Sequence, residues 1–352
     1  MIEISRKHLG TLLAAMLAVT VGTGAAPESS APDLSYDSVP NLLKLPENLY
    51  LGEVAGVATN SKGHLFVFTR TGDEVLIAGG SRAFLHGGSR LLEFDQNGAF
   101  VHEIGQGIYG FMSAHAVRVD REDNIWIVDE QSNMVIKFAP DGRFLMALGR
   151  KPESVSVPVH APEKSSGLGI PGDTFNGPTD VAWDAKGDIF VADGSGNARI
   201  VKLTPTGAYI KAWGGRGTGN GQFGNIHTLA IDAKDNIYAG DQKNKRIAVF
   251  DNDGNYLRTI EDIGTPAAIC ISPGSQQYLY SSNSNSPTDL EHGEIYKLGL
   301  DGHVLGKFGT AGKRLKQFGS VHEIDCRENN VLYVGELTNW RVQKLILHSG
   351  KP

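Results

Sequence analysis

The sequence has few of the features that often account for stability or mark a protein's partners. Only two of its 352 residues are cysteines, Cys270 and Cys326, so disulfide bonds cannot be its main source of stability. These two can still pair with each other in an oxidising compartment. The formal net charge is −6 and no basic block occurs, which argues against nucleic acid as the main partner.

The chain begins with an apolar run that is too short for a comfortable membrane span. Residues 9–21 form this run, the basic residues Arg6 and Lys7 precede it, and small residues follow it up to residue 26. This order is typical of a secretory signal peptide, although a short amphipathic anchor or a disordered tail is the alternative. We therefore predict a signal peptide over residues 1–26, a flexible lead-in over 27–40, and a secreted or periplasmic protein without a stable membrane anchor.

Glycine is abundant, with 44 residues against only 8% aromatics, which fits many short strands joined by tight turns. A repeat supports this interpretation, and each copy holds four short alternating runs broken by turns such as Asp-Gly. The clearest copies span 114–149, 178–214 and 226–260, and weaker ones start near Val54, Pro266 and Val321. We predict an all-β protein, a six-bladed β-propeller over residues 41–348 with four antiparallel strands per blade. A solenoid or two sandwiches would fit the strand count, but the repeats are neither short nor capped.

The sixth copy ends after its third strand and lacks a fourth. Residues Asn41 to Leu45, which precede the first copy, are the predicted replacement. Such a closure ties the two chain ends together and removes the last open sheet edge.

Aligning the copies on their first strand brings histidines to one repeat position in alternate blades. The six residues at that position are Ala55, His115, Thr179, His227, Ala267 and His322. Alternate blades of a six-fold ring direct three imidazoles at the axis from directions about 120° apart, which follows from the 60° turn between blades. Three imidazoles with an open position suit catalytic zinc, which acidifies a bound water or hydroxyl. The alternative is that the histidines only bond to backbone at the strand starts.

The turns between the second and third strands return to the face that bears the histidines. They contain the following residues or their neighbours: Arg70, Gln131, Ser195, Gln242, Asn283 and Leu337. Arg70 is the one cation that we place there. It would hold a carboxylate or a developing oxyanion, unless it is a surface arginine of a loop.

The repeat resembles the NHL repeat and not the WD repeat, because Gly-His and Trp-Asp pairs are missing at the expected offsets. The chain further resembles the peptidyl-α-hydroxyglycine α-amidating lyases and their bacterial NHL-repeat relatives over nearly the whole propeller. The matching pieces are GEVAGV at 52–57, FTR at 68–70, PTDVA at 178–182, DGSGNARIV at 193–201, GQF at 221–223 with His227, and VHEI at 321–324.

This resemblance implies that the three histidines bind zinc. It also implies a structural calcium on the axis, bound by the backbone carbonyls of Val57 and Val117 and by the carboxylate of Glu323. Oxygen ligands of this kind are what a hard cation prefers.

Catalysis in the resembling family uses a tyrosine and two arginines near the zinc, and it cleaves a carbinolamide into an amide and glyoxylate. Arg70 matches one arginine, whereas Ser195 stands at the tyrosine position and Gln242 at that of the second arginine. A serine hydroxyl has a far higher pKa than a phenol and cannot simply replace it. The metal site is therefore better supported than the lyase reaction.

Three functions stay open at this stage. The first is a zinc-dependent carbon–nitrogen lyase, or a hydrolase or lactonase, that acts on a small-molecule or peptide substrate. The second is a non-catalytic propeller that keeps a structural metal and binds a peptide, sugar or protein, which Ser195 and Gln242 favour. The third is a metal-free scaffold, against which the alternating histidines argue. We expect a monomer in each case.

Overall fold

The computed structural model describes residues 31–71, 76–77, 83–84, 88–151, 166–285 and 290–348. The predicted signal peptide lies outside these residues and stays a prediction. Within them, no helix is long and apolar enough to cross a membrane.

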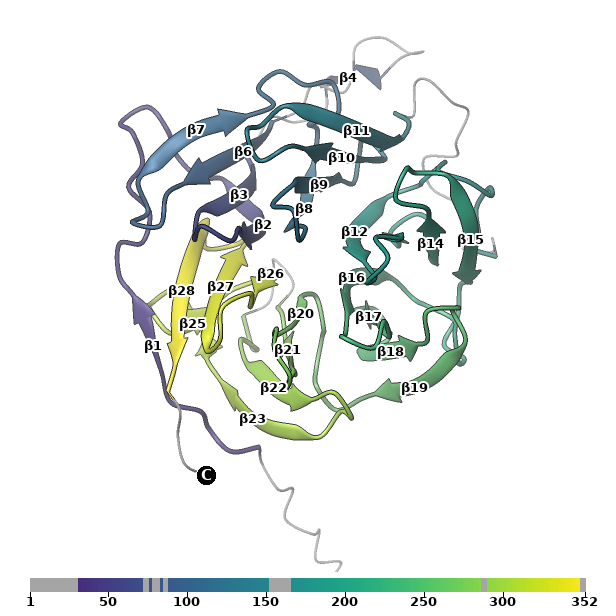
Figure 1. The fold of residues 1–352 in the computed structure, drawn as a ribbon. Helices are drawn as coiled ribbons and strands as arrows, with labels where there is room; N and C mark the ends of the chain where they lie inside the picture. Colours follow the sequence, from purple (N-terminus) through teal and green to yellow (C-terminus); the bar gives the residue numbers. More distant parts are fainter. Residues whose placement is uncertain are drawn as a thin grey trace, which may run out of the picture. The chain divides into compact units, whose positions relative to one another are not determined.

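Six four-stranded antiparallel sheets form a ring of blades (Figure 1), which confirms the predicted propeller. The first blade consists of β2 (Glu53–Thr59), β3 (Leu65–Arg70), β6 (Ser89–Phe94) and β7 (Phe100–Ile104). The second consists of β8 (Ala114–Val119), β9 (Ile125–Asp129), β10 (Met134–Phe138) and β11 (Phe144–Gly149). The third consists of β12 (Pro178–Trp183), β13 (Ile189–Asp193), β14 (Arg199–Leu203) and β15 (Tyr209–Gly214).

The other three blades repeat this plan. The fourth consists of β16 (Ile226–Ile231), β17 (Ile237–Asp241), β18 (Arg246–Phe250) and β19 (Tyr256–Ile260). The fifth consists of β20 (Ile269–Ile271), β21 (Tyr278–Ser282), β22 (Ile295–Gly299) and β23 (Val304–Phe308). The sixth consists of β26 (Val321–Asp325), β27 (Val331–Glu336), β28 (Arg341–Leu347) and β1 (Tyr36–Val39). Two short pairs, β4 (Leu76–Ile77) with β5 (Ala83–Phe84) and β24 (Thr310–Ala311) with β25 (Gln317–Phe318), lie outside the blades.

The ring closes through β1, which pairs antiparallel with β28 from the other end of the chain. The predicted closing segment, Asn41 to Leu45, is wrong, because the chain turns at Asn41 in the left-handed region with φ of 49°. Lys44 instead forms an isolated bridge with Ala99 of the first blade. The propeller therefore begins at Tyr36, inside the segment 27–40 that we predicted as a lead-in.

Burial within a blade falls from the inner strands to the outer one. All five residues of β9 and of β13 are buried, whereas β11 and β15 are largely exposed or half-buried. The inner strands pack against neighbouring blades on both faces, and strands buried on both faces read as continuous apolar runs. This explains the runs IWIVD and IFVAD in the sequence. Figure 1 shows β2, β8, β12, β16, β20 and β26 around the centre of the ring.

The two cysteines are joined in a disulfide between the fifth and sixth blades. Their Cα atoms lie 6.0 Å apart, and 56 residues separate them in the sequence. The pairing that the sequence left open is therefore present in the fold.

Candidate metal centre

A β-bulge places each histidine. In the second, fourth and sixth blades, the pairing of the innermost strand shifts register around His115, His227 and His322. The same shift surrounds Ala55 and Thr179 at the equivalent position. A bulged residue has no partner in the ladder, and bulges re-aim side chains next to active sites.

A buried carboxylate at the end of the second strand holds the segment that leads into each bulge. Asp129 accepts hydrogen bonds of 2.7 Å from the backbone N–H groups of Met112 and Ser113, just before His115. Asp241 accepts bonds of 2.9 and 3.1 Å from two backbone N–H groups before His227. Glu336 accepts one of 2.8 Å before His322. Burial raises the pKa of Asp129 to about 6.

The three imidazoles converge as the alternate spacing predicts. Their ring centroids are separated by 4.6, 4.7 and 4.7 Å, and their possible ligand atoms all lie within 4.8 Å of one another. The exposed fraction of each residue is below a tenth. Three such nitrogens, and no carboxylate in the set, suit zinc or another transition metal better than calcium or magnesium.

Burial lowers the pKa of all three histidines below the usual value. Repulsion between the imidazoles adds to this for His115 and His322, and the guanidinium of Arg70 lowers all three. The rings therefore stay neutral in neutral solution, which is the state that binds a metal.

Backbone carbonyls fix the orientation of two rings. The Nδ1 of His227 lies 2.7 Å from the carbonyl oxygen of Ala267, and that of His322 lies 2.7 Å from the carbonyl oxygen of Ala55. A carbonyl only accepts, so Nδ1 donates and Nε2 keeps its lone pair. The backbone of Thr179, at the equivalent position of the next blade, raises the pKa of His115 against the larger effect of burial, so this ring also faces a bulge. Backbone contacts and metal binding are thus compatible, because neutral imidazoles that face the backbone with Nδ1 keep the lone pair of Nε2 for a metal ion.

The histidines lie in a cavity of about 390 Å³. It brings together most of the side chains that we predicted at the mouth, either directly or through a neighbour. The other lining residues are Arg70, Glu130, Ser195, Asn225, Gln242, Ala267, Ser284, Asn285, Ser320, Val321 and Leu337.

Arg70, at the end of β3, is anchored beside the histidines. Its Nε donates to the carbonyl of Ala114 at 2.7 Å, and one terminal nitrogen lies 3.4 Å from the carboxylate of Glu53. A guanidinium held in this way keeps its remaining donors in a fixed direction. The structure therefore places Arg70 in the cavity of the three histidines and not in a surface loop.

Glu130 also lines the cavity. The sequence prediction named the next residue of the same turn, Gln131, and gave Glu130 no role of its own. Its carboxylate makes no hydrogen bond or ion pair with any described residue. Its charge raises the pKa of His227, against the larger effect of burial, so the carboxylate lies near that imidazole. The signal that would have found it is an acid directly after the second strand of a histidine-bearing blade.

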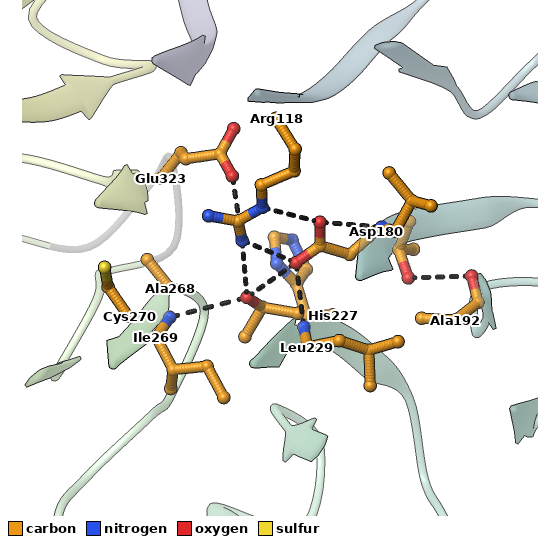
Figure 2. Close-up of polar contacts among 12 residues, drawn as sticks. Arg118, Asp180, Ala192, His227, Leu229, Ala268, Ile269, Cys270 and Glu323 are labelled. Carbon is orange, nitrogen blue, oxygen red and sulfur yellow. Dashed lines mark hydrogen bonds and ion pairs between the residues drawn. The ribbon is translucent and has the colours of Figure 1, made fainter. Parts of the chain in front are cut away.

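The residues present do not fit the calcium ion that the resemblance implies. One carboxylate oxygen of Glu323 accepts a hydrogen bond from the backbone N–H of Val117 at 3.1 Å. The other lies 2.9 Å from the guanidinium of Arg118 (Figure 2). The only carboxylate of the expected ligand set, which also included the carbonyls of Val57 and Val117, already has a cation.

Similarity to known proteins agrees with this architecture. A family model described as a six-bladed β-propeller matches residues 177–342. Peptidyl-α-hydroxyglycine α-amidating lyase 1 of Drosophila melanogaster is 29% identical over 68% of this chain and 45% of its own length. NHL repeat-containing protein 3 of Mus musculus is 26% identical over 86% of this chain and 82% of its own.

The chain is a six-bladed β-propeller homologous to the amidating enzymes and to NHL-repeat proteins. It matches about a third of the length of the peptidylglycine α-amidating monooxygenases of rat and mouse. A solved streptogramin B lyase shares the fold, with a TM-score of 0.53 and 13% identity over 90% of this chain and 97% of that one.

Proposed function

We propose that this propeller is an exported, monomeric zinc-dependent lyase that cleaves a carbon–nitrogen bond in a small-molecule or peptide substrate. The observation that carries the proposal is the convergence of three neutral, buried imidazoles in a cavity that also holds Arg70. Similarity to an amidating lyase supports the reaction class. The disulfide supports export, because such bonds persist in oxidising compartments.

His115, His227 and His322 would hold the zinc ion. When bound, zinc supplies Lewis acidity toward an oxygen of the substrate. The carbonyls of Ala55 and Ala267 hold two of the imidazoles in the orientation that this requires.

Arg70 binds and orients a substrate carboxylate in this proposal. Its contacts with Ala114 and Glu53 leave donors available to the cavity. A guanidinium matches a carboxylate with two parallel hydrogen bonds, which fixes the substrate as well as attracting it.

Glu130 takes the role of proton acceptor that Ser195 cannot fill. Both side chains line the cavity, and a carboxylate is a far stronger proton acceptor than a serine hydroxyl. In the cleavage of a carbinolamide, Glu130 takes the hydroxyl proton, the C–O bond becomes a carbonyl, and the C–N bond breaks. The nitrogen keeps the electron pair of that bond and receives the proton from Glu130, which yields an amide and an aldehyde and restores the carboxylate.

A binding propeller without catalysis is the second candidate. Ser195 and Gln242 line the cavity where the resembling family has a tyrosine and an arginine, and this favours it. Asn225, Ser284 and Asn285 add neutral hydrogen-bonding groups that suit a peptide or a sugar.

Turnover by the full chain, purified without a metal-affinity column, separates the two candidates. The lyase proposal expects release of glyoxylate from an α-hydroxyglycine peptide, with loss of release after removal of zinc and recovery after its return. Binding of the peptide with no glyoxylate, at full zinc occupancy, would contradict the lyase and support the binding propeller.

A further inference from the structure

A second polar cluster lies in the channel, formed by the residues that directly follow the bulges. Asp180 and Glu323 occupy the position after Thr179 and His322, and they are 1% and 2% exposed. Thr228 occupies the same position after His227 and is also buried. Burial raises the pKa of Glu323, and a positive charge close by counteracts this effect.

Arg118 supplies that charge. Its Nε and one terminal nitrogen bind the two carboxylate oxygens of Asp180 at 2.9 and 2.6 Å. The same terminal nitrogen lies 2.9 Å from Glu323 (Figure 2). It also donates to the hydroxyl of Thr228 at 3.3 Å. One side chain of β8 thus joins the innermost strands of four blades, the second, third, fourth and sixth.

Further donors contact the oxygens of the two carboxylates, most of them at Asp180. Asp180 accepts hydrogen bonds of 2.8 Å from the backbone N–H groups of Val181 and Leu229, and one of 2.9 Å from the hydroxyl of Thr228. Glu323 accepts one from Val117. Calcium needs six to eight oxygen ligands at about 2.3–2.6 Å. Both oxygens of Asp180 already accept from several donors, and each oxygen of Glu323 faces one.

We propose that the guanidinium of Arg118 is the axial structural cation of this protein and takes the place of calcium. The protein then folds and stays folded without calcium. Replacing Arg118 by a small residue exposes the oxygens of Asp180, Glu323 and Thr228 to one another and turns the cluster into a calcium site. This inference does not depend on the proposed lyase activity.

Calcium titration of the wild-type full chain tests the first part. The protein is freed of metal by dialysis against a chelator, and calcium chloride or magnesium chloride is added while thermal unfolding and calcium uptake are measured. The expected result is no uptake of calcium at micromolar concentrations and no change in Tm. Uptake of one calcium per chain with a rise in Tm would overturn the proposal.

The Arg118→Ala variant tests the second part. Without calcium, its Tm should fall by roughly 10 °C, because two buried carboxylates lose their cation. Calcium should restore part of that loss, and the double variant Arg118→Ala with Glu323→Gln should not recover. Arg121→Ala, at an exposed arginine on the same blade, is the matched control and should leave Tm unchanged.

An Arg118→Ala protein that is folded and equally stable with and without calcium would also overturn the proposal. If that variant does not fold, Arg118→Lys replaces it. Lysine keeps the charge but not the planar fork, so it should lower Tm by less and still show no response to calcium.

Discussion

Two adjacent layers of the channel differ in a way that the shared repeat does not suggest. The histidine layer holds three neutral imidazoles, and its nearest cation, Arg70, repels added positive charge. The arginine layer, formed by Arg118, Asp180, Glu323 and Thr228, holds its own cation within a closed set of hydrogen bonds. The first layer presents lone pairs that suit a metal ion, whereas every carboxylate oxygen of the second layer already faces an N–H or O–H donor. Adjacent positions of one repeat can therefore give a candidate metal site and a hydrogen-bonded ion cluster.

The difference follows from donors and acceptors rather than from burial, since both layers are buried. A neutral imidazole whose Nδ1 donates to a backbone carbonyl keeps a lone pair on Nε2. A carboxylate surrounded by N–H groups and a guanidinium does not. Substitutions in one layer should therefore leave the other nearly intact.

The largest effect is expected at Glu130, which belongs to the open side of the histidine layer. Glu130→Gln should lower glyoxylate release by about 10²- to 10⁴-fold, the usual contribution of a general base, while zinc content stays the same. Glu122→Gln, at an exposed glutamate of the same blade, should retain activity. Equal rates of glyoxylate release in both variants would show that Glu130 takes no part in the reaction.

Asp180→Asn should break the arginine layer without emptying the histidine layer. The free energy of unfolding should fall by about 3–5 kcal/mol, because a buried guanidinium loses a carboxylate partner. Denaturant unfolding measures this, and elemental analysis of the folded variant should still find zinc. Loss of zinc in a folded Asp180→Asn protein would show that the two layers are coupled.

The smallest effect is a pH dependence confined to the histidine layer. The folded-state pKa values of His115, His227 and His322 are lowered by burial, so the unfolded chain binds more protons just below its own value of about 6.5. Their contribution to stability is full above that pH and decreases as the pH falls below it.

Unfolding of the metal-free protein between pH 7.5 and 5 checks this expectation. Buried carboxyls such as Asp129, whose pKa is raised to about 6, act in the opposite direction, because their contribution decreases as the pH rises toward that value. The comparison is therefore between the wild type and His115→Ala. The wild type should lose more stability on acidification than the variant, and parallel curves would contradict the lowered histidine pKa.

The periodicity of the sequence predicts the parts that depend on the repeat. The blade count and the convergence of His115, His227 and His322 follow from spacing alone, because a ring brings alternate copies to one point. The position of Arg70 also follows, since the turn after each second strand returns to the histidine face.

The sequence does not predict what depends on contacts between blades. The closing strand is Tyr36–Val39 and not Asn41 to Leu45, because pairing with β28 decides it and the segment has no repeat of its own. The repeat does not assign a partner to Arg118, because its contact with Glu323 joins strands of two different blades. At the place where the resemblance implies calcium, the structure has the guanidinium of Arg118 beside Glu323.

Metal analysis of the full chain and of His227→Ala, both purified without a metal-affinity column, tests the central claim most directly. His303→Ala, at an exposed histidine, is the matched control. The two-layer account predicts one zinc and no calcium per chain in the wild type and in His303→Ala, and almost no zinc in a folded His227→Ala protein. Unchanged zinc after loss of His227, or a wild type that carries calcium in place of zinc, would contradict it.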